Sequence, residues 1–153
     1  MVRDRLMEED SSLVIAAPEA LPREAAALVH TSDYLKDLDG DEHTERTQAS
    51  ELPLSRQIVN AYYLATAGTC LAAKLALEHG GGMNLSGGFH HAYADRAEGF
   101  CYLNDVAIAV RQLQKDDGVG KVAIVDCDVH QGNGTARIFE DDGTVFTFSI
   151  HQR

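Results

Sequence analysis

The segment that most constrains the fold runs from residue 121 to residue 136 and reads KVAIVDCDVHQGNGTA. Its first half is short, uninterrupted and β-branched, which is typical of a strand buried on both faces of a parallel sheet. Asp126, Asp128 and His130 follow, and their side chains lean to one side if the backbone stays extended. Open α/β sheets bind ligands at the carboxyl ends of their strands, and buried charges need a partner, a donor or a metal. A binding or metal site is therefore expected here, in preference to a strand end with solvated acids.

The pattern of elements around this segment predicts an α/β domain with a parallel sheet. Strand patterns occupy residues 13–16, 83–85, 121–126 and 144–150. Helical patterns occupy residues 22–29, 32–38, 54–79, 105–114 and 134–139. The long helix is expected to end at Gly80, and Asn104 is expected to cap the helix after it. Strands and helices that alternate in this way predict right-handed crossovers.

Both ends of the chain suggest an incomplete domain. The last residues, HQR, follow a predicted strand directly, with no element to cover it. A parallel sheet normally needs helices on both faces, and the N-terminal portion supplies little sheet. We therefore interpret residues 1–153 as one truncated domain, the N-terminal to central part of a larger fold.

Composition excludes several classes of protein. A hydrophobic content of 44% is enough for a core, and a net charge of −11 argues against a general binder of nucleic acids or anionic membranes. No secretory signal is visible, and the longest apolar stretch, residues 61–77, is too short and polar for a membrane span. Three cysteines without a close pair suggest reduced thiols. We expect a cytoplasmic protein.

A second candidate site is the glycine-flanked sequence GGFHHA, residues 87–92. In an irregular loop His90 and His91 can turn into one cleft, and an imidazole pair beside a metal suits general acid and base catalysis. Taken alone, two loop histidines with ordinary hydrogen bonds would be the simpler interpretation. Asp128 and His130 suit a borderline cation such as Zn²⁺, which takes three protein ligands in most catalytic sites.

Four motifs together resemble one family. GGFHHA, EGFCYLND, VDCDVHQGNG and FTFSIH have the order and spacing of the zinc-dependent histone deacetylases, including bacterial relatives such as acetoin-utilization and acetylpolyamine deacetylases. DRAEGF and HQGNG are most similar to the class IV branch and its bacterial counterparts. The resemblance implies an arginase/deacetylase fold, an α/β architecture with a parallel sheet sandwiched by helices, here incomplete at both ends.

The resemblance also implies catalytic roles. His90 and His91 would be the catalytic pair, with Asp126 orienting His90 and Asn133 orienting His91. Many relatives have Asp where this chain has Asn133. An Asn partner is neutral, so it should stabilise an imidazolium less than a carboxylate would.

Metal and substrate sites follow by the same resemblance. Asp128 and His130 would be zinc ligands, and Gly99 and Phe100 would line a tunnel for acyl-lysine. A structural potassium site would use five residues, partly through backbone oxygens: Asp126, Asp128, His130, Ser149 and Ile150.

Two family positions do not occur in this sequence. The third zinc ligand, an Asp on a later strand, and the Tyr that stabilises the oxyanion both lie later than Arg153. We therefore expect a zinc-dependent hydrolase by family, acting on acetylated lysine or an acetylated small amine, of which this chain is a weakly active or inactive fragment. The sequence does not discriminate among these substrates.

Two other readings of the sequence stay open. A hydrophobic strand followed by DxDxV is also the nucleophile motif of haloacid-dehalogenase-type phosphatases, in which Asp126 would attack phosphorus, Asp128 would act as acid and base, and Mg²⁺ would be the metal. This reading leaves GGFHHA and EGFCYLND unexplained. The other alternative is a non-catalytic deacetylase-like module that binds an acylated ligand or a partner chain.

Overall fold

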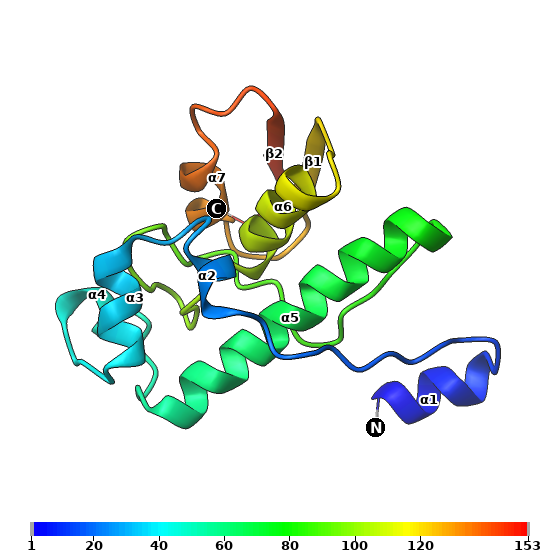
Figure 1. Ribbon diagram of the computed structural model, residues 1–153, viewed down its shortest axis with the longest axis horizontal. Coiled ribbons are helices and arrows are strands. Elements are labelled where there is room, and N and C mark those ends of the chain that lie inside the picture. Colours follow the sequence, from blue (N-terminus) through cyan, green and yellow to red (C-terminus); the bar gives the residue numbers. More distant parts are fainter. Residues whose placement is uncertain (1, 153) are drawn as a thin grey trace.

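The computed structural model describes residues 2–152. Its helices are, in chain order, α1 (Val2–Glu9), α2 (Arg23–Ala26), α3 (Ser32–Asp39), α4 (Glu45–Gln48), α5 (Arg56–His79), α6 (Asp105–Asp116) and α7 (Asn133–Ile138). Its strands are β1 (Val122–Asp126) and β2 (Val145–Ser149). Figure 1 shows the long helix α5 crossing the molecule, with α6, α7 and the sheet on one side of it. No helix within residues 2–152 is long and apolar enough to cross a membrane.

Local sequence signals set the bounds of the two main helices. The Ser55 hydroxyl accepts the backbone N–H of Ile58 at the start of α5, and Gly80 ends the helix with φ 85°. Asn104 caps α6 through the backbone N–H of Ala107. The two helices pack against each other. Between them and α3 lies the main core, which contains Tyr34, Leu38, Val59, Tyr63, Tyr102, Leu103 and Ile108.

The two strands pair in parallel, with Val122 opposite Val145 and Asp126 opposite Ser149. They are connected through α7, as the sequence predicts. One face of this sheet packs on α6 and α7 around Ala107, Val110 and Phe139.

The other face is open, which corrects the expectation of a strand buried on both sides. Val125 and its paired residue Phe148 are 64% and 49% exposed, and Phe146 is 63% exposed. No element of residues 2–152 covers this face, because all the helices that touch the sheet lie on the opposite side.

The N-terminal and central loops also differ from the sequence prediction. Residues 13–16 and 83–85 form no strand, because neither has a neighbouring strand to pair with in the described chain. Helix α1 has no buried residue and projects from the body (Figure 1). Residues 86–100 form the long irregular loop expected from their glycine and histidine content.

Candidate catalytic and metal site

The two adjacent histidines turn toward each other in their loop. The ring centroids of His90 and His91 lie 4.1 Å apart with planes at 50°. The irregular backbone allows this, because neighbouring residues on a strand would point to opposite faces. The His91 ring also lies near His130, with the two ring centroids 5.9 Å apart.

The first histidine is held by the acid at the end of β1. His90 Nδ1 lies 2.5 Å from Asp126 Oδ2, and both side chains are largely buried. Asp126 is on the inner face of the sheet, opposite Ser149. Its other oxygen, Oδ1, accepts the backbone N–H of Asp128 at 3.0 Å. The structure thus brings His90 and Asp126 together.

The second histidine is held by the first residue of α7. His91 Nδ1 lies 2.7 Å from Asn133 Oδ1. The same oxygen accepts the backbone N–H of Gly134 at 3.0 Å. At the other end of the amide, Asn133 Nδ2 donates to Glu98 Oε1 at 2.6 Å. The sequence pattern assigns no role to Glu98, because 35 residues separate it from Asn133.

Asp128 and His130 lie in a turn beyond β1. The strand ends at Asp126, so the backbone does not stay extended through Asp128 and His130, contrary to the expectation from the sequence. Asp128 Oδ1 accepts the backbone N–H of His130 at 2.7 Å and lies 3.1 Å from His130 Nδ1. This backbone bond is the main reason that the pKa of Asp128 is lowered. Both side chains are exposed, and Asp128 Oδ1 is also 3.8 Å from His90 Nε2.

These two donors fit a zinc ion in chemistry but not in number. A carboxylate and an imidazole whose ligand atoms converge are an appropriate pair for Zn²⁺. Within residues 2–152 no group of three or more His, Cys, Asp or Glu side chains is placed to hold a metal. Any zinc held here would therefore need a further ligand from outside the described residues.

A tight turn carries the two expected tunnel residues. Glu98 and Cys101 exchange both backbone hydrogen bonds, at 3.2 and 2.9 Å. Between them Gly99 and Phe100 have φ 50° and 64°, as in a turn with two left-handed central residues. A Cβ on Gly99 would lie 2.6 Å from His91 Cδ2, so the turn packs directly on the His91 ring. Position 99 therefore favours glycine for two reasons: its φ is positive, and a side chain there would collide with the His91 ring.

The exposed ring of Phe100 stands at the tip of this turn. Its backbone N–H donates to the Ser50 carbonyl at 2.9 Å, and its own carbonyl accepts the Tyr62 hydroxyl. Burial raises the pKa of Tyr62 to about 12, so this hydroxyl keeps its proton and remains a donor. The side chain of Phe100, 58% exposed, is thus presented from a backbone fixed on both sides.

A buried acid holds the start of the histidine loop. Asp105, fully buried at the first position of α6, accepts the backbone N–H groups of Gly88 at 3.0 Å and Phe89 at 2.7 Å. It also accepts the Thr69 hydroxyl from α5 at 2.5 Å. From the sequence, Asp105 is expected only to begin a helix. The structure shows that it ties both long helices to the segment before His90.

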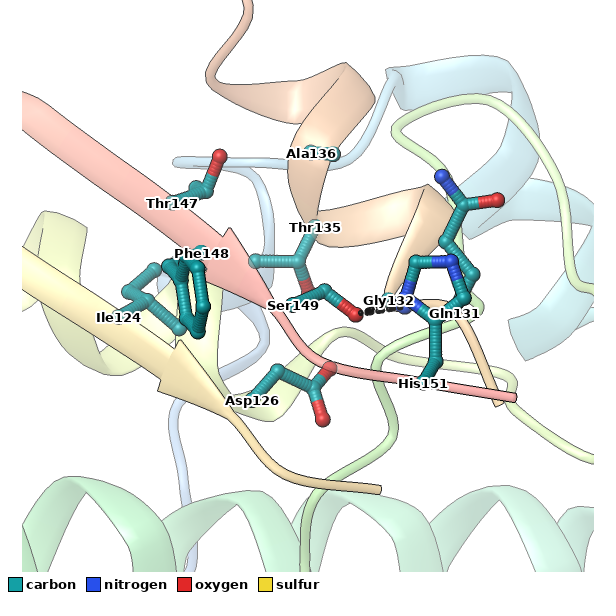
Figure 2. Close-up of a pocket in the computed structure, with 10 residues that line it drawn as sticks. All are labelled: Ile124, Asp126, Gln131, Gly132, Thr135, Ala136, Thr147, Phe148, Ser149 and His151. Carbon is teal, nitrogen blue, oxygen red and sulfur yellow. Dashed lines mark hydrogen bonds between the residues drawn. The ribbon is translucent and has the colours of Figure 1, made fainter. Parts of the chain in front are cut away.

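The residues expected at a potassium site meet only in part. Asp126 and Ser149 are paired across the strand ends, and the Ile150 N–H donates to the Asp126 carbonyl at 3.0 Å. Beside them lies a cavity of about 200 Å³, with Asp126 and Ser149 in its wall (Figure 2). The Ser149 hydroxyl accepts the Gly132 N–H at 3.3 Å. Asp128 and His130 lie in the turn beyond β1, outside this wall.

Comparison with known proteins gives a consistent result. Residues 1–153 match the family model of the histone deacetylase domain. The chain is 47% identical over 135 residues to an uncharacterized protein of Picosynechococcus, covering 88% of this chain and 45% of that protein. It is 32% identical to the acetoin utilization protein AcuC of Bacillus subtilis, over 90% of this chain and 38% of AcuC. It is 30% identical to histone deacetylase 2 of Arabidopsis thaliana, over 99% of this chain and 40% of the relative.

Solved structures agree with the sequence relatives. A crystal structure of a histone deacetylase homologue from Aquifex aeolicus superposes with a TM-score of 0.81 at 28% identity, covering 97% of this chain and 43% of that one. The fold is therefore that of the arginase/deacetylase type. The chain spans less than half the length of these relatives. These matches do not favour the phosphatase alternative.

Proposed function

Because the chain belongs to the histone deacetylase domain family, whose members are hydrolases, we propose that it carries part of the active site of a zinc-dependent amide hydrolase. Its substrate would be an acetylated or otherwise acylated lysine, or a similar acylated amine. One observation carries the proposal. Two histidines, each with its Nδ1 on an acceptor side chain, lie beside an Asp and a His that can ligate a metal.

Asp128 and His130 would hold the zinc, with a further ligand from outside the described residues. Zinc in such a site polarises an acyl carbonyl and makes a bound water easier to deprotonate. Asp128 is suited to this role because the His130 backbone N–H keeps its pKa low, so that it is ionised at neutral pH. Like the zinc ion, a potassium ion near Asp126 and Ser149 is proposed.

The histidine pair would move the protons. Each Nδ1 donates to its acceptor, which leaves each Nε2 free on the opposite side of its ring. His91, whose partner is a neutral amide, would take the proton of the attacking water. His90, whose partner is a carboxylate, would stabilise positive charge, and one of the two histidines would then protonate the leaving amine.

Gly99 and Phe100 would position the substrate. The exposed Phe100 ring would stand at the entrance, and the Gly99 backbone lies against His91. A slender acyl chain that passes along this turn would reach the His90–His91 pair. Acetyl-lysine and acetylated small amines both have this shape, so the substrate class is proposed without choosing between them.

Metal binding gives the first test. In a calorimetric titration of the purified chain with Zn²⁺, His130→Ala and Asp128→Asn should each weaken binding by about ten-fold or more. His79→Ala is the matched control, because His79 is an exposed histidine at the end of α5 and should bind zinc no differently from the parent. Binding that is unchanged in both site variants would contradict the proposal.

Hydrolysis gives the second test. The zinc-loaded chain, incubated with an acetyl-lysine peptide, should release acetate slowly, and His91→Ala should remove this activity. Peptide binding without release of acetate would support the non-catalytic alternative. A Mg²⁺-dependent phosphatase activity that is lost in Asp126→Asn would overturn the proposal.

A further inference from the structure

The neutral partner of His91 is itself bound to an acid. Asn133 Nδ2 donates to Glu98 Oε1 at 2.6 Å, and Asn133 Oδ1 lies 2.7 Å from His91 Nδ1. The three side chains therefore form one continuous hydrogen-bonded series. Each of these distances is within the range of a strong hydrogen bond.

Glu98 determines which way the Asn133 amide faces. An ionised carboxylate only accepts hydrogen bonds, so the NH₂ end of the amide must point to Glu98. The carbonyl end then faces His91 and the Gly134 N–H, which it accepts at 3.0 Å. A flipped amide would bring two donors together at Gly134 and two acceptors together at Glu98, and both contacts would be repulsive.

The orientation of the amide in turn fixes the proton on His91. Because Asn133 offers an oxygen, His91 Nδ1 must carry a hydrogen to make the bond. The lone pair of the neutral ring is then on Nε2, the nitrogen that can accept a proton. With a flipped amide the lone pair would be on Nδ1, where it could not reach a substrate.

Contacts of its backbone and side chain hold Glu98 in the position from which it orients the Asn133 amide. Its backbone makes both hydrogen bonds of the turn with Cys101. Its second carboxylate oxygen lies 3.6 Å from Arg96 Nη2, and the Arg96 guanidinium stacks 3.6 Å above the Tyr93 ring. The Glu98 side chain is 37% exposed.

We propose that Glu98 is a positioning residue that locks the Asn133 amide, so that His91 carries its proton on Nδ1 and keeps Nε2 available. This inference rests on the proposed function only in giving His91 a role in proton transfer. The lock itself is a property of the chain without metal or substrate, so it is tested separately.

The first experiment reads the tautomer directly. Histidine ¹⁵N NMR of the full chain, without zinc and at a pH where imidazole is neutral, should show His91 protonated on Nδ1. Glu98→Ala should shift a large share of His91 to the Nε2-protonated form. Asp95→Ala is the matched control, since Asp95 contacts the same arginine at 3.3 Å and should leave His91 unchanged. A Glu98→Ala spectrum with an unchanged His91 tautomer would overturn the proposal.

The second experiment exchanges the charges and does not depend on the stability of Glu98→Ala. Asn133→Asp sets two carboxylates against each other at a contact that is now 2.6 Å. It should displace His91 and lower hydrolysis by the zinc-loaded chain about ten-fold. Glu98→Gln with Asn133→Asp restores one donor and one acceptor, and should recover the parental tautomer and most of the activity.

The outcomes separate the two proposals. Additive losses in the double variant, or no loss in Asn133→Asp, would overturn the role of Glu98. A chain that shows the expected tautomers and rescue of His91 but binds Zn²⁺ no differently from its Asp128→Asn and His130→Ala variants would support the lock while contradicting the proposed function.

Discussion

At the scale of single residues, the candidate site depends on side chains whose partners come from distant parts of the sequence. His90 meets Asp126, and His91 meets Asn133, across separations of 36 and 42 residues. Asp105, by contrast, accepts the Gly88 N–H from the helix that follows the histidine loop. Glu98 lies within the loop and reaches His91 only through Asn133.

Gly99 provides a prediction at this scale. Gly99→Ala should cost about 1–3 kcal/mol of unfolding free energy, because alanine is strained at positive φ and its Cβ would collide with the His91 ring. The measurement is urea unfolding, together with the ¹⁵N spectrum of His91, which should change. Gly143→Ala is the control, because a Cβ there meets nothing within 4 Å. Equal stability of the two variants would contradict this account of the turn.

At the scale of elements, α6 organises the site from its N-terminus. Asn104, fully buried, caps the helix and also donates from Nδ2 to the Ala92 carbonyl and the Thr135 hydroxyl, both at 3.0 Å. Asp105 follows it and holds the loop before His90. One helix end therefore connects the histidine loop, α7 and the core.

Asn104→Ala should accordingly be more damaging than the loss of an ordinary helix cap. We expect a loss of about 3 kcal/mol, since the cap and two buried hydrogen bonds disappear together. Ser55→Ala, which removes the cap of α5 at a more exposed position, should cost about 1 kcal/mol. Denaturant unfolding of both variants checks the difference, and similar losses would show that the contacts to Ala92 and Thr135 contribute little.

Local signals explain which elements could be predicted from the sequence. The end of α5 at His79 and the cap of α6 were predicted because Gly80 and Asn104 act on their own neighbours. Residues 13–16 and 83–85 were wrongly predicted as strands, because strand formation depends on a partner that the local pattern does not reveal. The exposure of one face of β1 was not predicted either, because it also depends on which other elements pack against the strand.

Some contacts of the candidate site could likewise be predicted before the structure was known, and others could not. The pairing of Asp126 with His90 and of Asn133 with His91 followed from family resemblance and agrees with the geometry, while the roles of these residues stay predictions. Glu98 was not found, because its contact with Asn133 depends on a turn with positive φ at Phe100, a backbone angle that the residue type does not indicate.

At the scale of the whole molecule, stability should depend on pH through His30. This histidine is buried beside Tyr34 and accepts the Asn104 N–H at 3.1 Å, so it joins the N-terminal segment to the start of α6. Burial lowers the pKa of His30 from 6.5 to about 4. The folded chain therefore keeps this ring neutral where the unfolded chain would protonate it.

The sign of the effect follows from this difference. Stability from His30 is fully present above pH 6.5 and is lost as the pH falls toward about 4. The total change should be about 3 kcal/mol. Urea unfolding across this range should show the loss in the parent chain and in His79→Gln, but not in His30→Gln. A parent chain whose stability is flat between these pH values would contradict the prediction.

The turn at residues 98–101 has a consequence for how substrate range could change in this family. Phe100 at the rim and Glu98 at the base share one rigid backbone ring, closed by two hydrogen bonds. A substitution that widens the entrance for a bulkier acyl group by shifting this backbone would also move the carboxylate that bonds to Asn133. Under the proposed function, selectivity and reactivity would be linked through this backbone, and an adaptation at the entrance would require a second, compensating substitution near Asn133.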